Sequence, residues 1–424
     1  MNAAEQGHLL LRQGKAKEAE VAFRRALETE PDHVEALNVV GLAALRDGDI
    51  DRALTLLKRA AAVDGGQGLT HLHLGRAHAA AFELEAAAAA FVTALAREPK
   101  LHAARLHLAE LHEKRGDTTL AVMTYARALN DAQAQGRWLN AATTPAGLQG
   151  AVNHAQQFVR ERRLAGFAEL MEPFAKQYGR GALRRVEQAV RIHLHLEQPV
   201  FPDPRQKPTF LFFPGLPATP YLDKGLIAEI EGLEARTNEI RAELLALLPS
   251  AAGRERVFHT GELEGTNLRG LDTPPSWNGY YFFRHGERRA DNCAACPNTA
   301  AALDALPLAR VRGHGPEVLY SVFSPGTHLL PHCGVTNTRV VAHLPLMIPE
   351  DCALRVGGED HHWREGEVVV FDDTYDHEAW NRSGRTRVVM IFDLWNPFLT
   401  QAERAVLAEL VIAMGEFRAG LEAL

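Results

Sequence analysis

A period of 34 residues constrains the first third of the chain more than any other feature of the sequence. Gly7, Gly41 and Gly75 recur at this spacing, and Ala109 takes the fourth place. Three further positions keep the same register in all four units: an alanine, a large residue and a second alanine (Ala19, Ala53, Ala87, Ala121; Phe23, Leu57, Phe91, Tyr125; Ala26, Ala60, Ala94, Ala128). Small residues let two helices cross closely and the large residue fills the gap, so the pattern predicts an α-solenoid of four stacked helical hairpins.

These residues resemble a tetratricopeptide repeat array over roughly residues 1–133. The resemblance implies a concave groove that binds a partner, either a peptide or protein or a tethered amino-acid substrate. An array that only packs against the rest of the chain, or that forms a dimer, remains an alternative, because a solenoid fold does not name its ligand.

The remaining sequence predicts two further segments. Residues 134–200 keep a helical pattern without the 34-residue register and are expected to form a helical connector. A proline-rich stretch then begins a domain over residues 201–424, in which TFLFF (209–213) is the expected first strand and 226–248 one long helix. Short strand-like runs separated by turns follow, then an amphipathic closing helix. This pattern predicts a double-stranded β-helix, or jelly-roll barrel, with flanking helices, in a multidomain α + β protein.

Composition excludes several classes of function. The formal net charge is -7 and no block of lysine and arginine occurs, so neither a nucleic-acid partner nor an anionic membrane is expected. No apolar run reaches the roughly 18 residues of a membrane span, and the polar N-terminal stretch lacks a signal-peptide core. Four cysteines are too few for a disulfide framework in 424 residues. A cytoplasmic location is the resulting prediction.

The candidate chemistry lies near the C-terminal end of the chain. His332 and His377 are 45 positions apart, and Arg387 follows ten positions later on the strand-like run TRVVMIFDLW. Two histidines from different strands of a barrel can hold iron and leave coordination positions open. On a regular strand Arg387 and Asp393 share one face. A buried guanidinium needs a carboxylate, and both a structural pair with Asp393 and a carboxylate of a cosubstrate stay open.

A second strand shows a similar inward face. In TRVVAHLPL, alternation places Arg339, Val341 and His343 on the same side. Polar side chains on the inward face of an apolar strand suggest a lined cavity. His343 is therefore a candidate to contact a bound cosubstrate, and Arg339 a candidate to contact the substrate.

The residues SVFSPGTHLLPHCGVTN, HLPL and FDDTYDHEAWN, with an arginine ten residues after the second histidine, resemble the aspartyl/asparaginyl β-hydroxylases. The resemblance implies a 2-oxoglutarate- and Fe(II)-dependent dioxygenase, an oxidoreductase that uses O2 to hydroxylate the β-carbon of an aspartyl/asparaginyl-type residue. It further implies that His332 and His377 ligate the iron. Arg387 and Ser321 would bind the distal carboxylate of 2-oxoglutarate, and His343 would contact its metal-bound end.

Two positions leave alternatives open. Gly334 stands where most enzymes of this chemistry carry a carboxylate ligand. The resembling family lacks this carboxylate too, as do iron-dependent halogenases. The third iron position would therefore take water, another small ligand or halide. Val341 stands where relatives that act on protein domains usually place a second arginine. Halogenation, hydroxylation of a small molecule or lipid acyl chain, and a non-catalytic binding protein whose repeats alone act therefore remain competing hypotheses.

Other polar residues near the site give weaker signals. Cys293 and Cys296 form a CxxC without a second pair, which disfavours a redox or zinc function. Four carboxylates flank His377, and they are expected either to orient the ligand histidines or to be solvated loop charges (Asp372, Asp373, Asp376, Glu378).

Overall fold

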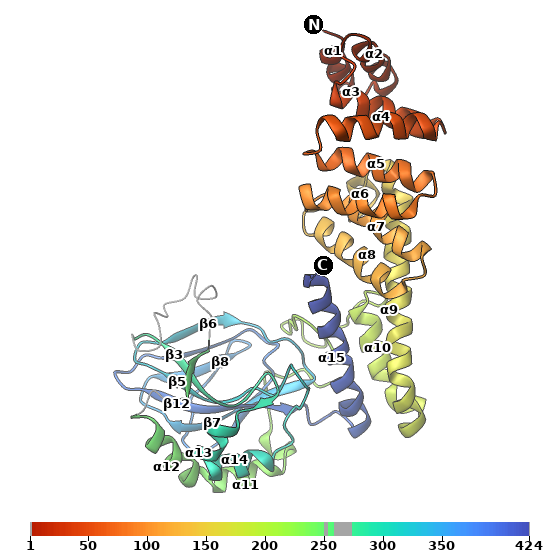
Figure 1. Cartoon of the computed structure of the whole chain (residues 1–424). Coiled ribbons are helices and arrows are strands. Elements are labelled where there is room, and N and C mark those ends of the chain that lie inside the picture. The colour runs from red at the N-terminus through yellow and green to blue at the C-terminus, as the bar shows by residue number, and fades with distance from the viewer. Residues whose placement is uncertain (1, 250–252, 258–273, 424) are drawn as a thin grey trace. The chain divides into compact units, whose positions relative to one another are not determined.

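A computed structural model describes residues 2–249, 253–257 and 274–423 of the chain (Figure 1). The described chain divides into two compact units. The first, here called the repeat unit, comprises residues 1–163 together with 417–424, and the second, here called the sheet unit, comprises residues 164–416.

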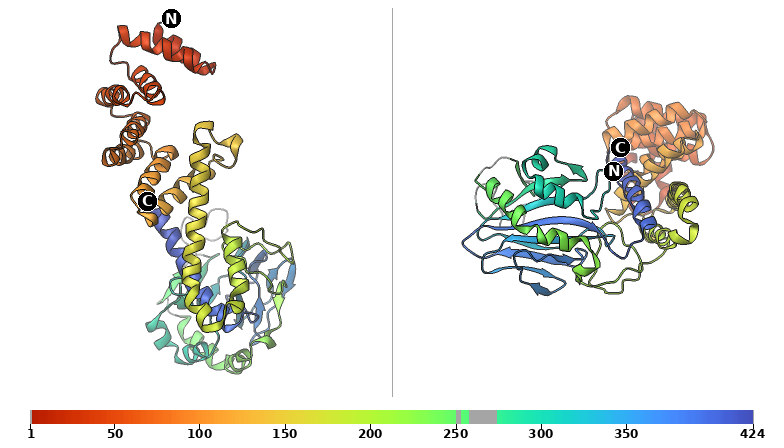
Figure 2. Two further views of the ribbon diagram at one scale, coloured as in Figure 1. Left: turned by 90° about the vertical axis from the view of Figure 1, so that its right-hand side faces the viewer. Right: turned by 90° about the horizontal axis from the view of Figure 1, so that it is seen from below.

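The repeat unit contains four consecutive helical hairpins, which confirms the predicted α-solenoid (Figures 1 and 2). Gly75 lies against Phe91 so closely that an added Cβ would be 2.5 Å from the ring, and Gly41 meets Leu57 in the same way. The small residue therefore permits the crossing of the two helices in each hairpin, as the 34-residue register predicts. The helices are α1 (Ala3–Arg12), α2 (Ala16–Thr29), α3 (Val34–Arg46), α4 (Ile50–Val63), α5 (Gly68–Ala80), α6 (Leu84–Arg97), α7 (His102–Lys114) and α8 (Thr118–Gln133).

Further helices follow the repeats. The short 3-10 turns η1 (Ala141–Thr143) and η2 (Ala146–Leu148) precede α9 (Gln149–Tyr178), then come η3 (Arg180–Leu183) and α10 (Arg184–His193). Within the sheet unit, residues of α9 and α10 share an apolar cluster with α15 (Gln401–Ala423), for example Phe167, Val186 and Val406. The predicted closing helix is thus present.

The sheet unit is built on two antiparallel sheets. In the larger sheet the described strands run in the order β1-β10-β7-β12-β5-β3-β2, with β4 beside β3, and in the smaller sheet β6-β11-β8-β9. From β5 to β8 and from β10 to β12 the chain alternates between the two sheets, the winding of a double-stranded β-helix, so the predicted jelly roll is confirmed. The strands are β1 (Tyr221–Leu222), β2 (Arg254–Arg256), β3 (Trp277–Arg284), β4 (Glu287–Arg288), β5 (Val318–Phe323), β6 (His328–His332), β7 (Arg339–Met347), β8 (Cys352–Val356), β9 (Glu359–His361), β10 (Val369–Phe371), β11 (His377–Asn381) and β12 (Arg387–Trp395).

One face of the larger sheet is covered by helices. These are η4 (Lys224–Leu226), α11 (Glu229–Ala235), α12 (Thr237–Leu247), α13 (Ala290–Ala295) and α14 (Pro297–Asp304) (Figure 1). Their apolar side chains form the main core with inward residues of the sheet, such as Ile240 with Tyr320 and Val340. The other face of the sheet turns toward the smaller sheet, and the candidate site lies there.

Two predicted elements differ from the structure. The expected helix over 226–248 is interrupted at Arg236, where the Thr237 hydroxyl donates to the Glu234 carbonyl at 2.7 Å, and the break lets α11 and α12 both reach the sheet. The stretch 209–213 forms only one bridge, between Leu211 and Thr336. The Asn337 side chain binds both the N–H and the C=O of Phe213, so these groups do not form the next pair of strand-to-strand hydrogen bonds.

Among the residues that the structure describes, no helix is long and apolar enough to cross a membrane.

Candidate active site

The two candidate iron ligands are direct neighbours across a strand pair. His332 ends β6 and His377 begins β11, the two residues oppose each other in the antiparallel register, and their ring centroids are 4.0 Å apart. The Nδ1 atom of His332 donates to the Leu330 carbonyl at 2.9 Å, and that of His377 to the Tyr375 carbonyl at 3.0 Å. Each neutral ring therefore keeps the lone pair on Nε2, the atom that can bind a metal.

Burial and the neighbouring His332 lower the pKa of His377 to about 3. A buried imidazolium is disfavoured because it loses hydration, and the second ring adds like charge once it is protonated. His377 is thus neutral at physiological pH, the form required of a ligand.

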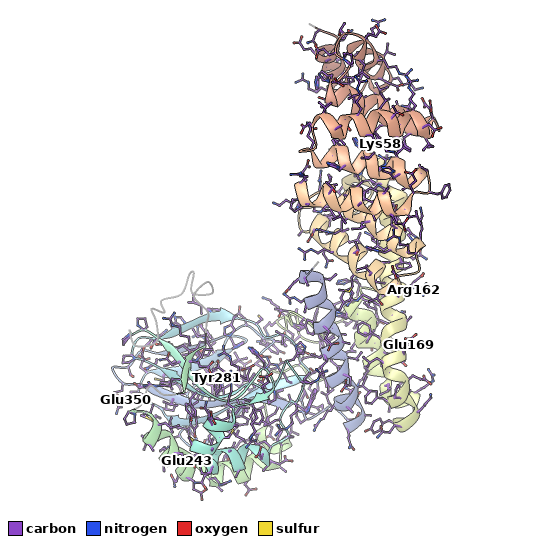
Figure 3. All side chains as sticks on the ribbon, viewed as in Figure 1. Lys58, Arg162, Glu169, Glu243, Tyr281 and Glu350 are labelled. Carbon is purple, nitrogen blue, oxygen red and sulfur yellow. The ribbon has the colours of Figure 1, made fainter. Side chains whose placement is uncertain are left out.

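One cavity of about 210 Å³ opens between the two sheets. All six residues singled out from the sequence line it: Ser321, His332, Arg339, His343, His377 and Arg387. They come from β5, β6, β7, β11 and β12, which are separated by loops in the sequence and brought together only by the barrel. Tyr281 of β3 also lines the cavity and is labelled among the strands of the sheet unit in Figure 3.

Arg387 is a buried cation without a carboxylate partner among the described residues. It is 1% exposed, and its guanidinium lies between two aromatic faces, 4.2 Å from the Phe323 ring centroid and 4.3 Å from that of Trp363. Its Nε atom has no hydrogen-bond partner in the described structure. Burial lowers the pKa of Arg387 to about 9, while contact with two ring faces favours the charged form. The structural pair with Asp393 considered from the sequence is not formed.

Ser321 lies beside this guanidinium. Its hydroxyl oxygen accepts from Trp277 Nε1 at 2.9 Å and from Arg387 Nη1 at 3.4 Å. Because both acceptor sites of the oxygen face donors, the hydroxyl proton is available to an acceptor in the cavity. Arg387 and Ser321 together offer the donors that a carboxylate needs.

His343 is also buried, and its Nδ1 atom has no partner in the described structure. The ring packs edge-on against Phe371 with 5.0 Å between centroids. Burial, together with the charge of Arg387, lowers the pKa of His343 well below its usual value. A neutral imidazole at this place can exchange a hydrogen bond with a cavity ligand and adds no charge.

Arg339, in contrast, is already paired. Its Nη2 atom is 3.1 Å from Asp373 Oδ2, and its Nη1 atom pairs with Asp393 Oδ1. The register of β7 and β12 explains the second pair, because Asp393 opposes Val341 and so lies beside Arg339, away from Arg387.

The position two residues after His332 has no side chain, and a neighbour takes the space. A Cβ at Gly334 would overlap the carboxylate of Asp373. The backbone carbonyl of Asp373 accepts from the Gly334 N–H at 2.6 Å. Asp373 is 5% exposed, and its Oδ1 atom has no partner in the described part of the chain. Among the described residues no three His, Cys, Asp or Glu side chains gather into a metal site. A metal ion here would take two protein ligands.

The other polar residues around His377 have separate partners. Glu378 pairs with His328 at 2.7 Å and with Arg355 at 3.0 Å, and Asp372 accepts from Gln206 at 2.7 Å. Backbone carbonyls orient the two histidine rings, so carboxylates do not have that role. Cys296 is fully buried, and burial raises its pKa to about 12, which agrees with an unreactive CxxC.

Sequence reasoning missed the aromatic residues beside Arg387 and Ser321, and it did not pair Asp393 with Arg339. Trp363, Phe323 and Trp277 support Arg387 and Ser321. Trp363 carried a signal in the sequence, because the face of a tryptophan ring attracts a cation such as a buried arginine. The pairing of Asp393 with Arg339 required the register of two strands, which a single sequence does not contain.

Comparisons with known proteins agree with the two predicted kinds of domain. Residues 234–397 match the family model described as aspartyl/asparaginyl beta-hydroxylase, and residues 5–68 and 72–137 match that of a tetratricopeptide repeat. An aspartate beta-hydroxylase domain-containing protein 2 of Rattus norvegicus is 32% identical over 245 residues, which are 56% of this chain and 68% of the relative. The chain belongs to the aspartyl/asparaginyl β-hydroxylase family.

Two other relatives match shorter parts of the chain. The human aspartyl/asparaginyl beta-hydroxylase is 34% identical over 194 residues, 45% of this chain and 24% of the relative. An ornithine lipid ester-linked acyl 2-hydroxylase of Rhizobium tropici is 35% identical over 166 residues, 38% of this chain and 56% of the relative. The chain therefore spans about a quarter of the length of the human β-hydroxylase that it matches.

Proposed function

We propose that the sheet unit is an Fe(II)- and 2-oxoglutarate-dependent hydroxylase of an aspartyl/asparaginyl-type residue in a peptide, protein or related substrate. The observation that carries the proposal is the unpaired Arg387, 1% exposed, in the same cavity as two histidines whose rings are 4.0 Å apart. A buried cation without a counter-charge is costly and is explained by an anionic ligand.

The residues present fit iron. His332 and His377 would hold the ion through Nε2. Gly334 supplies no side-chain ligand, and the Asp373 carboxylate lies where a side chain at Gly334 would be. When bound, iron and 2-oxoglutarate supply O2-dependent hydroxylation, in which one oxygen atom enters a substrate C–H bond and the other enters succinate as carbon dioxide leaves.

The residues of this chain contribute binding and exclusion of water. Arg387 and the Ser321 hydroxyl donate to the distal carboxylate of the cosubstrate, and neutral His343 contacts its other end. Apolar side chains such as Leu319, Leu354 and Ile391 line the walls between these polar groups. The cavity thus favours one orientation of the dicarboxylate and limits access of bulk water.

A second candidate is hydroxylation of a lipid acyl chain. It is favoured by the similarity to the Rhizobium tropici acyl 2-hydroxylase and by Val341 in the lining. Halogenation is disfavoured, because a halide beside Gly334 would lie against the Asp373 carboxylate.

Anaerobic titration of the full chain with Fe(II) and 2-oxoglutarate, followed by exposure to O2, tests the proposal. We expect one iron and one 2-oxoglutarate per chain and formation of succinate, with iron binding lost in His332→Ala and in His377→Ala. Full iron binding by either variant would overturn the ligand assignment. Mass spectrometry of candidate peptides and acyl lipids, for a gain of one oxygen atom, separates the two substrate classes.

Arg387→Lys tests the cosubstrate site separately. We expect its affinity for 2-oxoglutarate to fall at least about tenfold, since an ammonium cannot reproduce the planar fork of donors. Arg385→Lys, two residues away on the surface, is the matched control and leaves the affinity unchanged. Equal affinities in the two variants would remove Arg387 from the cosubstrate site.

The repeats are proposed to recruit a partner or the substrate through their groove. This part of the proposal is supported by the match of residues 5–68 and 72–137 to the tetratricopeptide repeat family.

A further inference from the structure

The cavity has two chemically different ends. Along β12, Arg387 and Asp393 are six residues apart, which corresponds to about 20 Å in an extended strand. A five-carbon dicarboxylate held by Arg387 is much shorter than this. The end that contains Arg339, Asp373 and Asp393 is thus left for the substrate.

At this second end the one cation is fully engaged. Each arm of the Arg339 guanidinium pairs with a different carboxylate, Asp373 at 3.1 Å and Asp393 at a shorter distance. Both carboxylates are fixed in the fold, with Asp393 accepting from the Glu317 N–H at 3.0 Å. They are 5% and 3% exposed, so neither can turn away into water.

Carboxyl groups outnumber cationic side chains at this end. Three carboxylates, those of Glu317, Asp373 and Asp393, accompany one guanidinium in the lining. Asp373 lines the cavity, and its buried Oδ1 atom has no hydrogen-bond partner among the described residues. Of the lining residues that the structure describes, Arg387 is the other arginine, and no lysine is present.

From this arrangement we infer that the substrate group bound at the Arg339 end carries hydrogen-bond donors and no negative charge: a primary amide or an amine, and not a carboxylate. An entering carboxylate would meet three acidic side chains and an arginine without a free arm, whereas an amide or ammonium N–H can donate to Asp373. The inference rests on the proposed function and narrows it to asparaginyl-type or amine-bearing substrates.

The test compares three probes, two of them nearly isosteric, on the full chain loaded with Mn(II) and the unreactive 2-oxoglutarate analogue N-oxalylglycine. Dissociation constants are measured by calorimetry for N-acetyl-asparagine amide, N-acetyl-aspartate amide and N-acetyl-ornithine amide. We expect the asparagine and ornithine probes to bind and the aspartate probe to bind at least about tenfold more weakly, because like charges across an interface are repulsive.

Aspartate binding as tight as asparagine binding would overturn the inference, and so would failure of all three probes on protein that does bind N-oxalylglycine. Loss of N-oxalylglycine binding itself would instead contradict the proposed function. The variant Asp393→Asn releases one arm of Arg339, so the tenfold difference between the dissociation constants of the asparagine and aspartate probes should disappear. Glu317→Gln serves the same purpose if Asp393→Asn does not fold, and an unchanged gap in a folded variant would contradict the role of these carboxylates.

Discussion

Two arginines in one cavity differ in their partners. Arg339 is bound by two aspartates, whereas Arg387 has two aromatic faces and a serine hydroxyl. Rings replace water around Arg387, interact with the cation through their π faces, and leave its Nε donor without a partner in the described structure. An unused donor inside a protein can bind an anion, so the aromatic neighbours help to determine what Arg387 can do.

Replacement of Trp363 by leucine tests this role. The loss of one ring face, worth about 0.5–2 kcal/mol, is expected to weaken 2-oxoglutarate binding several-fold although every hydrogen-bonding residue remains. The variant Trp363→Phe, which keeps a ring, should retain most of the affinity. Calorimetric titration with 2-oxoglutarate measures both, and equal losses in the two variants would indicate that packing alone is responsible.

Glu317 gives a prediction about pH. Its pKa is raised to about 7, chiefly by burial, from 4.5. The folded state therefore holds the proton more tightly than the unfolded state, and stability is lost as pH rises from about 4.5 through 7. The groups that face this carboxylate are His285, Arg284, Arg339 and Asp393.

The variant Glu317→Gln keeps an acceptor for the His285 N–H and removes the charge. Its thermal midpoint is expected to exceed that of the natural chain at pH 8, and the difference should shrink toward pH 5, where the natural glutamate is protonated in the folded state. Calorimetric scans at both values measure the difference. A gap that is constant with pH would show that Glu317 does not titrate in this range.

At the scale of elements, the hairpins of the repeat unit were readable from the sequence because their information is local. Gly75 and Phe91 are sixteen positions apart and lie on adjacent helices, so spacing alone indicates the contact. The strands of the jelly roll were also indicated by alternation, as was the inward face with Arg339, Val341 and His343.

The sequence did not contain the alignment of neighbouring strands, nor did it show which side chains compete with a strand for backbone hydrogen bonds. The partner of Asp393 depends on how β12 aligns with β7, and the Leu211 bridge is not extended because the Asn337 side chain binds Phe213. Both outcomes depend on residues more than 50 positions apart. The sequence predicted that the candidate ligands share one cavity, but it did not predict which carboxylates surround Arg339 at the other end of that cavity.

A change at Gly75 tests the helix crossing. Gly75→Ala puts a methyl group 2.5 Å from the Phe91 ring, and we expect the repeat unit to lose about 1–3 kcal/mol of stability through overpacking. Gly150→Ala in α9, where a Cβ meets nothing within 4 Å, is the control and should be neutral or slightly stabilising. Helical circular dichroism during urea unfolding measures both, and equal midpoints would contradict the close crossing.

At the scale of the whole molecule, the repeat unit is made of two chain segments that are distant in sequence, whereas the sheet unit is one continuous segment. Residues 417–424 belong to the repeat unit, where the Leu421 carbonyl accepts from Arg127 at 2.6 Å and the Phe417 ring lies 4.4 Å from the Arg163 guanidinium. The repeat unit thus depends on residues that follow the sheet unit.

Phe417→Ala is expected to lower the free energy of unfolding of the repeat unit by about 1 kcal/mol, because it removes the ring that lies over the Arg163 guanidinium. Arg418→Ala, the neighbouring surface position with one exposed pair to Glu422, should have little effect. Hydrogen exchange followed by mass spectrometry should show faster exchange in α8 and the N-terminal part of α9 for Phe417→Ala, with strands β5 to β12 unchanged. Equal exchange in the two variants would contradict this dependence.

The return of residues 417–424 to the repeat unit has a consequence for biosynthesis. A ribosome makes the helical hairpins first and these eight residues only after every strand of the barrel, so the array emerges without the segment that contacts Arg127 and Arg163. Until that segment arrives, the surface around α8 stays open to chaperones or to neighbouring nascent chains. The contacts of Arg127 and Arg163 are therefore completed only by residues that are translated after the barrel strands.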